Sequence, residues 1–142
     1  MGIINKLESV LVEESILPIT KETWQSFNIN HHCPADHAER KEQYKFIKDK
    51  VGNKSGIYIY KKDEQIIYIG KAKLLYDRLK SHYIESFSPV PGDTKDMRWH
   101  RFFSEYNGEV EVYWKEFEYE EERVVVEILL TKLLRPIFLM YK

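Results

Sequence analysis

Two short segments of the chain carry tyrosines at positions where strand formation would bring them together. Residues 56–60 read Gly-Ile-Tyr-Ile-Tyr, and residues 66–70 read Ile-Ile-Tyr-Ile-Gly after five polar residues. Both segments are rich in β-branched and aromatic residues, so they predict a β-hairpin. Side chains alternate between the two faces of a strand, so Tyr58 and Tyr68 can meet across the hairpin beside Gly70. A glycine there would let a ligand backbone approach. The alternative is that the tyrosines are ordinary cross-strand aromatics filling the sheet surface.

A basic residue and a histidine follow on the next predicted element, a helix from about residue 72 to residue 84. Arg78 and His82 are four residues apart, so they lie on one face of that helix. An arginine can fork onto a phosphate, and a histidine can accept or relay a proton. The alternative is a solvated helix face. The packing side of the helix would be formed by Leu75, Leu79 and Tyr83.

Glu127 interrupts an apolar run near the C-terminus. It lies between Val124-Val125-Val126 and Ile128-Leu129-Leu130 on a helix predicted from about residue 119 to residue 134, ahead of Pro136. A carboxylate with apolar helical neighbours is costly unless it is paired or binds a cation. One use is as an oxygen ligand for a hard divalent metal such as Mg²⁺. The alternative is a glutamate at the edge of an amphipathic face, reaching water.

The elements that must position these residues form an α+β pattern. The hairpin and a third strand over residues 109–117 predict a small three-stranded antiparallel sheet flanked by helices. Residues 88–93 predict a loop, and residues 96–106 a short helix. We therefore expect one α+β domain over residues 53–142.

The first 52 residues lack the β-branched and aromatic clusters of the later segments and predict an N-terminal helical extension. Residues 3–14 place apolar side chains at helical spacing, whereas residues 15–35 contain Pro18 and Pro34 and predict an irregular stretch. A second helix should begin after Asp36, which forms a capping box with Glu39, and should end at Gly52.

Composition excludes several classes of protein. The chain has 142 residues, 43% of them hydrophobic and 32% charged, and a single cysteine, which excludes wholesale disorder and an internal disulfide. No apolar run approaches the length of a membrane span and no export signal is present, so we expect a cytoplasmic protein. The net charge of −1 hides an uneven distribution. Residues 51–101 hold 10 Lys and Arg against 6 Asp and Glu, which favours a modest, salt-sensitive affinity for nucleic acid.

Taken in order and at this spacing, the motif residues resemble the GIY-YIG nuclease family. The resemblance covers residues 56–139. It implies a small, free-standing endonuclease that uses Mg²⁺ or Mn²⁺ to hydrolyse phosphodiester bonds in DNA. The residues that carry it are Gly56-Ile57-Tyr58, Tyr68-Ile69-Gly70-Lys71, Arg78, His82, Glu127 and Pro136.

The resemblance also implies a role for each catalytic residue. Glu127 would bind a single divalent metal, and Arg78 would contact the scissile phosphate. Tyr58 and Tyr68 would line the site, with one helping to activate the attacking water, and His82 would support the first tyrosine. We expect Tyr58 to relay a proton to His82, its phenolate form being favoured by Lys71, Arg78 and the bound metal.

Further residues are expected to bind substrate. Gly70 and Lys71 belong to the second motif. Trp99 is flanked by basic side chains in an aromatic and basic mixture suited to a nucleic-acid strand. That segment consists of Arg98, Trp99, His100 and Arg101.

One departure from the family supports a rival hypothesis. Many relatives carry an asparagine twelve residues after the metal glutamate, where this chain has Leu139, and Asn107 cannot be assumed to replace it. The alternative is therefore a catalytically weak or inactive nucleic-acid-binding module of the same fold. In either case, target choice would need the extension, a homodimer or a partner protein.

A second alternative concerns the segment His31-His32-Cys33, followed by His37. Zinc sites use cysteine and histidine, but usually as better-spaced pairs. This segment is thus more typical of a loop, and a zinc-stabilised interaction domain is the weaker hypothesis.

Overall fold

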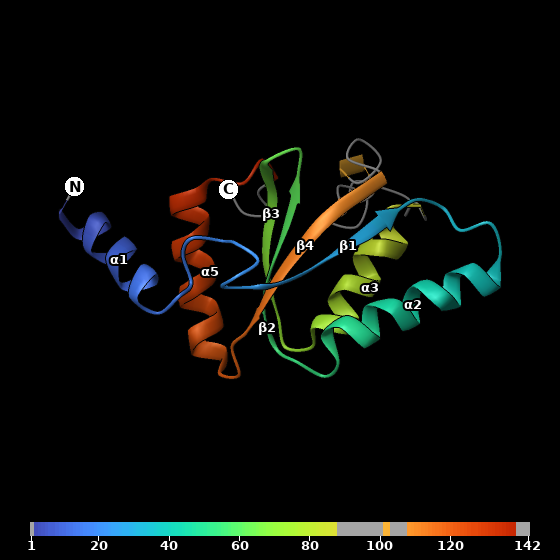
Figure 1. The fold of residues 1–142 in the computed structure, drawn as a ribbon, viewed down its shortest axis with the longest axis horizontal. Coiled ribbons are helices and arrows are strands. Elements are labelled where there is room, and N and C mark those ends of the chain that lie inside the picture. Colours follow the sequence, from blue (N-terminus) through green and yellow to red (C-terminus); the bar gives the residue numbers. More distant parts are fainter. Residues whose placement is uncertain (1, 88–100, 103–107, 139–142) are drawn as a thin grey trace.

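The computed structural model describes residues 2–87, 101–102 and 108–138, which form a four-stranded antiparallel sheet with helices on both faces (Figure 1). The strand order is β1-β4-β2-β3, so β2 and β4 are central. The strands are β1 (Gln25–His31), β2 (Gly56–Lys62), β3 (Gln65–Ala72) and β4 (Gly108–Glu116). The predicted hairpin is confirmed, because Tyr58 pairs with Gly70 and Tyr60 with Tyr68.

The described part of the chain forms four long helices around the sheet. α2 and α3 lie on one side of it and α5 on the other, with α1 beyond α5 at the far end of the molecule (Figure 1). Their bounds are α1 (Gly2–Glu13), α2 (His37–Val51), α3 (Leu75–Glu85) and α5 (Glu120–Leu134). None of the helices in the described part of the chain is long and apolar enough to cross a membrane.

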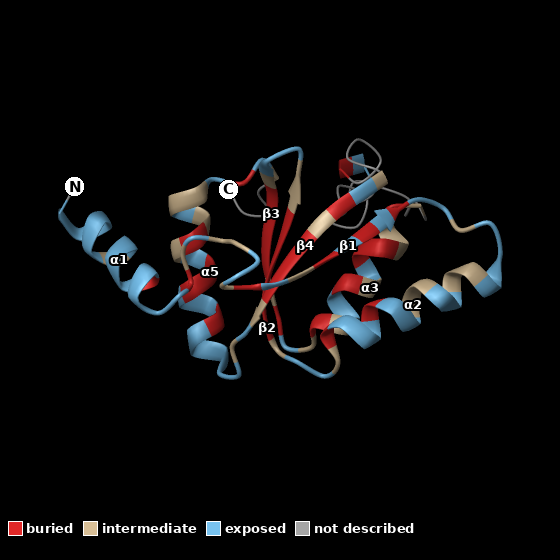
Figure 2. Cartoon of the chain, in the orientation of Figure 1, coloured by how far each residue is buried: buried red, intermediate tan, exposed pale blue. Residues whose placement is uncertain are grey.

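Alternation along β2 and β3 divides the core into two clusters. Figure 2 shows that burial follows the strands and the helix faces turned toward them. We call the side of the sheet that carries Tyr58, Tyr60 and Tyr68 the tyrosine face; its cluster includes Leu75 and Leu79 of α3. The opposite side is the isoleucine face, where the side chains packed against α5 and the N-terminal segment are Ile57, Ile59, Ile69, Leu11, Trp24, Val126 and Leu130.

The expected three-stranded sheet is wrong by one strand, which comes from the stretch predicted to be irregular. β1 pairs antiparallel with β4 over its whole length, from Gln25 opposite Trp114 to His31 opposite Gly108. Its sequence, Gln-Ser-Phe-Asn-Ile-Asn-His, holds few residues typical of strands. Phe27 and Ile29 nevertheless point into the core while Asn28 and Asn30 are exposed. The first 52 residues therefore supply helices, as expected, and also an edge strand.

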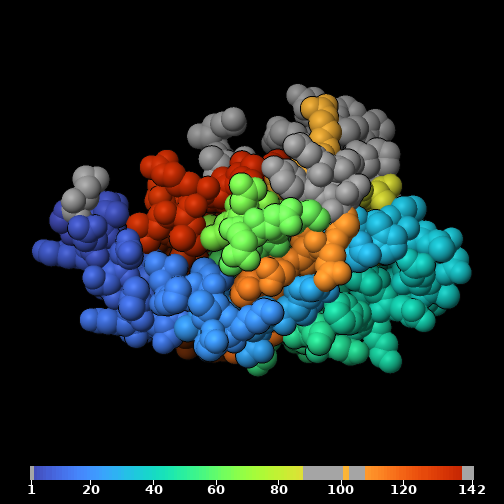
Figure 3. All heavy atoms as spheres, turned by 45° about the horizontal axis from the view of Figure 1, so that its top comes forward, coloured from blue at the N-terminus to red at the C-terminus, as the bar shows by residue number. Residues whose placement is uncertain are grey.

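The boundaries of α2 agree with the sequence signals. The Asp36 side chain accepts a hydrogen bond from the Glu39 backbone N–H at 2.8 Å, which satisfies a donor in the first turn. Gly52 ends the helix at φ +56°, a conformation that glycine adopts without strain. Figure 3 shows the N-terminal third of the chain, coloured blue to teal, along one long side of the molecule.

The chain returns to the tyrosine face after α5. The backbone N–H groups of Ile137 and Phe138 donate to the carbonyls of Ile66 and Ile67 on the outer edge of β3, at 3.2 and 2.9 Å. The Phe138 ring then lies 5.9 Å from that of Tyr68. This segment covers the exposed edge of β3. The loop predicted over 88–93 and most of the helix predicted over 96–106 lie outside the described residues.

Candidate active site

The two motif tyrosines meet on the tyrosine face. The ring centroids of Tyr58 and Tyr68 are 5.8 Å apart, and both rings are buried. A Cβ atom added at Gly70 would lie 2.5 Å from the Tyr58 hydroxyl oxygen and 2.7 Å from Tyr68 Cε2. Glycine is therefore required here by the two rings of the protein itself, and the approach of a ligand backbone is not needed to explain it.

A chain of hydrogen bonds leads from Tyr58 into α3. The Tyr58 hydroxyl lies 2.7 Å from His82 Nε2, and His82 Nδ1 lies 3.0 Å from Glu85 Oε1. Only 1% of the His82 side chain and 15% of the Glu85 side chain are exposed. His82 and Glu85 are three residues apart on α3, so their side chains lie on the same face of the helix and can contact each other. Sequence reasoning missed Glu85; its position three residues after His82 was the available signal.

This arrangement fixes which histidine nitrogen carries the proton when the ring is neutral. A carboxylate only accepts hydrogen bonds, so Nδ1 donates to Glu85, and Nε2 then accepts from the Tyr58 hydroxyl. The geometry is that of a base held in one tautomer by a carboxylate on its far side. A proton can therefore pass from the Tyr58 hydroxyl to His82 Nε2.

Burial controls the acidity of Tyr58. Desolvation, reinforced by Tyr68 and Tyr60, raises the pKa of the Tyr58 hydroxyl well above its usual value of 10, and Arg78 offsets this only in part. The protein's own groups therefore favour the neutral hydroxyl of Tyr58. A neutral hydroxyl can still pass a proton on, because it accepts one as it donates another.

Arg78 stands at the solvent edge of this group. It is exposed, while its charge still reaches the Tyr58 hydroxyl. It lines a pocket of about 520 Å³ together with Ala72, Lys73, Leu74, Asp77 and Ser81. Lys71, the last residue of the second motif, is half-buried near the end of β3. An anion in the pocket would meet the guanidinium fork of Arg78.

Glu127 is buried on α5, 7% exposed. Its neighbours Val126 and Leu130 pack on the isoleucine face, and α5 lies against β3 and β2. Among the described residues no group of three or more His, Cys, Asp or Glu side chains could hold a metal ion. A single carboxylate suits Mg²⁺, which commonly keeps several waters and takes one or two carboxylates. It does not suit structural zinc, which takes four protein ligands.

Some predicted residues cannot be placed. Arg98, Trp99 and His100 lie outside the described residues, as do Asn107 and Leu139. Arg101 is described and exposed.

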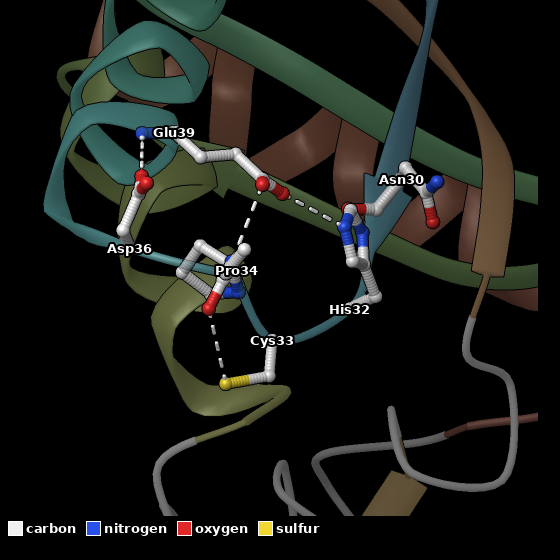
Figure 4. A network of polar contacts seen from close by, with 7 residues as sticks. Asn30, His32, Cys33, Pro34, Asp36 and Glu39 are labelled. Atoms are coloured by element: carbon white, nitrogen blue, oxygen red, sulfur yellow. Dashed lines mark hydrogen bonds and ion pairs between the residues drawn. The ribbon is translucent and has the colours of Figure 1, made fainter.

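The cluster considered for zinc does not converge. His31 is buried on the tyrosine face, with its ring 5.5 Å from that of Tyr60. Figure 4 shows His32 reaching Glu39, with Nε2 and Oε1 3.0 Å apart, and Cys33 turned toward the carbonyl of Pro34. These side chains have different partners, and His32 contacts the first turn of α2.

Parts of two UvrC proteins are similar to this chain. One curated relative, the UvrABC system protein C of Fervidobacterium nodosum, is 62% identical over 37 residues, which cover 26% of this chain and 7% of that protein. A solved relative is the GIY-YIG N-terminal endonuclease domain of UvrC from Thermotoga maritima bound to magnesium. It has 29% identity, covers 65% of this chain and 93% of that one, and has a TM-score of 0.43. A point mutant of that domain, also bound to its catalytic divalent cation, has 29% identity, covers 65% and 92%, and has a TM-score of 0.44.

The match to a protein-family model covers more of the chain than the match to the curated relative. The GIY-YIG catalytic domain matches residues 54–140, more than half of the chain and all of the motif residues from Gly56 to Pro136. This chain belongs to the GIY-YIG family.

Proposed function

We propose that this protein is an endonuclease that hydrolyses phosphodiester bonds in DNA with the help of Mg²⁺ or Mn²⁺. The observation that carries the proposal is the buried chain from Tyr58 through His82 to Glu85, with contacts of 2.7 and 3.0 Å. A hydroxyl backed by an oriented base is what activation of a water molecule requires. The family match supports the same reaction.

The proton follows the hydrogen bonds. As water attacks phosphorus, its proton passes to the Tyr58 oxygen while the Tyr58 proton passes to His82 Nε2. The imidazolium that forms is stabilised by the Glu85 carboxylate on Nδ1. Tyr58 ends the step neutral, so its raised pKa is no obstacle. The leaving oxygen keeps the electrons of the broken bond and is protonated afterwards.

Arg78 and Glu127 supply the remaining functions. Arg78 binds a phosphoryl oxygen from the rim of its pocket and offsets the negative charge that grows there. Glu127 holds the divalent cation, which when bound provides Lewis-acid charge at the phosphate. Lys71, Gly70 and Arg101, with the segment Arg98-Trp99-His100, stay predicted substrate-binding residues.

A plasmid-nicking assay tests the proposal. Supercoiled DNA with Mg²⁺ or Mn²⁺ should be cut by the wild type and cut about 10²–10⁴-fold more slowly by Tyr58→Phe. Glu127→Gln should lose most of its activity at equal metal concentration. Matched controls are Tyr119→Phe, at an exposed tyrosine, and Glu121→Gln, at an exposed glutamate of the same helix. Both controls should cut like the wild type.

The rival hypothesis predicts a different result. If the wild type binds supercoiled, branched and single-stranded DNA but never cuts them, the chain is a binding module of the same fold. The cytoplasmic location and a homodimer or partner protein for targeting stay predictions.

A further inference from the structure

Lysines and tyrosines alternate across the junction of α2 and α3. Lys80 Nζ lies 4.5 Å from the ring centroid of Tyr44 and 5.7 Å from that of Tyr76. Lys48 Nζ lies 4.9 Å from the ring centroid of Tyr76. α2 and α3 pack against each other, so two helices contribute to one continuous row. We call the row Lys48, Tyr76, Lys80 and Tyr44 the α2–α3 surface.

The two lysines of this surface are held near aromatic rings, and no carboxylate of the described residues pairs with them. A lysine ammonium within about 6 Å of an aromatic ring is attracted to its face, which restricts the long side chain. Lys48 is exposed and Lys80 half-exposed. Within the described residues neither forms an ion pair; Lys48 Nζ donates to the amide oxygen of Asn53 at 2.7 Å. Their charges therefore remain available to a partner.

The surface continues from the candidate active site around α3. Arg78 and Lys80 are two residues apart, so they project from nearly opposite flanks of the helix, about 10–12 Å apart in cross-section. A nucleic-acid strand carries one charge about every 3.4 Å of axis, so about three nucleotides span that width. Asp77 lies on the exposed ridge between them, beside Ser81. If a nucleic-acid strand bound by Arg78 crosses α3, it therefore reaches Lys80 and then Lys48.

The N-terminal segment supplies half of this surface. α2 lies before residue 54, where the match to the family begins. Residues 37–51 carry five Lys and Arg against three Asp and Glu. The same segment adds β1 to the sheet, and α2 packs on the helix that bears Arg78 and His82.

We propose that the α2–α3 surface binds the sugar-phosphate backbone of a nucleic acid, beyond the residues that surround the scissile phosphate. The proposal rests on the proposed function, because it assigns this surface to the same substrate. Positive charge gives the attraction, and the half-exposed rings of Tyr44 and Tyr76 give a face for sugars or unpaired bases. The N-terminal segment thereby lengthens the substrate track.

Binding of a fluorescent 20-base-pair duplex, measured by anisotropy in EDTA over a salt series, tests the proposal on the full chain. The variant Lys48→Gln/Lys80→Gln removes both charges and keeps most of each stem. It should bind about tenfold or more weakly at 0.1 M salt, and the slope of log K against log salt should fall by about 1.8. The arginine variant Lys48→Arg/Lys80→Arg should retain wild-type affinity, because it keeps charge and ring contact.

A matched control is Lys21→Gln/Lys132→Gln, which removes two exposed lysines elsewhere. If this pair loses as much affinity as Lys48→Gln/Lys80→Gln, or if the latter binds like the wild type, the proposal is wrong. It is also wrong if the wild type binds no duplex or single strand at low salt, or if the surface instead retains only an acidic protein.

The two proposals fail separately. Binding without cutting would overturn the nuclease proposal and leave this one standing. If the wild type cuts DNA and Lys48→Gln/Lys80→Gln cuts it with an unchanged KM, the nuclease proposal stands and the proposal for the α2–α3 surface is wrong.

Discussion

The same two strands, β2 and β3, present two different chemistries to the two sides of the sheet. On the isoleucine face, Ile57 and Ile59 are fully buried among apolar side chains. On the tyrosine face, Tyr58 and Tyr60 are just as deeply buried, but they bring hydroxyls into the core, and His31 and His82 lie beside them. Burial is therefore equal on the two sides, while the polar content is not.

The isoleucine face is expected to contribute mainly stability, and the tyrosine face mainly chemistry. Apolar burial stabilises the fold by roughly 25 cal/mol per Å² removed from water, with no hydrogen bond to satisfy. Buried polar groups must find partners, and their protonation equilibria shift as they leave water. We infer that substitutions on the isoleucine face act mainly on unfolding, and those on the tyrosine face mainly on catalysis and pH dependence.

The largest effect is expected on the isoleucine face. Ile59→Ala removes a side chain that is 0% exposed and should lower the free energy of unfolding by about 2–5 kcal/mol, measured by urea unfolding. The cutting rate per folded molecule should stay within a few fold of the wild type. The control Ile128→Ala, at a residue of α5 that is 52% exposed, should change stability by less than about 0.5 kcal/mol. A large rate loss in folded Ile59→Ala would contradict the separation.

The next effect is expected at Gly70, on the tyrosine face. Gly70→Ala forces a Cβ against the rings of Tyr58 and Tyr68, so the hydroxyl must move relative to His82. A displacement of that kind costs about 10²-fold in rate, which corresponds to about 2.7 kcal/mol in activation free energy. Single-turnover cutting is the measurement. Gly2→Ala, where a Cβ meets nothing within 4 Å, is the control and should cut normally.

Buried His31 should make stability depend on pH. Burial, with a smaller contribution from Lys62, lowers the pKa of His31 from 6.5 to about 3. Below pH 6.5 the unfolded chain takes up a proton that the folded chain does not, so stability falls as pH falls from 6.5 toward 3. Between pH 7 and pH 5 the loss from this group is about 2 kcal/mol. Urea unfolding at both values should show a smaller loss in His31→Leu; an equal loss would contradict the assignment.

The smallest effect is expected at Glu85. Glu85→Gln keeps the shape of the side chain and removes the charge that stabilises protonated His82, so kcat should fall about tenfold while KM stays constant. Nitrogen NMR of the His82 ring should show the proton on Nδ1 in the wild type and a mixture of tautomers in the variant. Glu121→Gln serves as the control. An unchanged kcat and an unchanged tautomer would show that Glu85 only packs.

Local patterns made much of the fold and site predictable. Period-two alternation placed Tyr58, Tyr68 and Gly70 on one face, since successive side chains of a regular strand point to opposite sides. Helical spacing placed Arg78 beside His82, and the Asp36 cap and Gly52 marked the ends of α2. These signals act within a few residues of chain, which is why a sequence without its structure reveals them.

Tertiary structure decided the remainder. β1 forms because β4, which lies far along the chain, supplies hydrogen-bonding partners to a segment with weak strand preference of its own. His31, next to exposed His32 in the sequence, is buried because the pleat of β1 turns it toward Tyr60. The shifted pKa of Tyr58 and its hydrogen bond to His82 depend on burial by α3 and on neighbours brought from separate elements. The sequence by itself determined which groups are available and which way each faces along its own element. Only packing determined which of them lose water and meet, because desolvation and contact are properties of the assembled core.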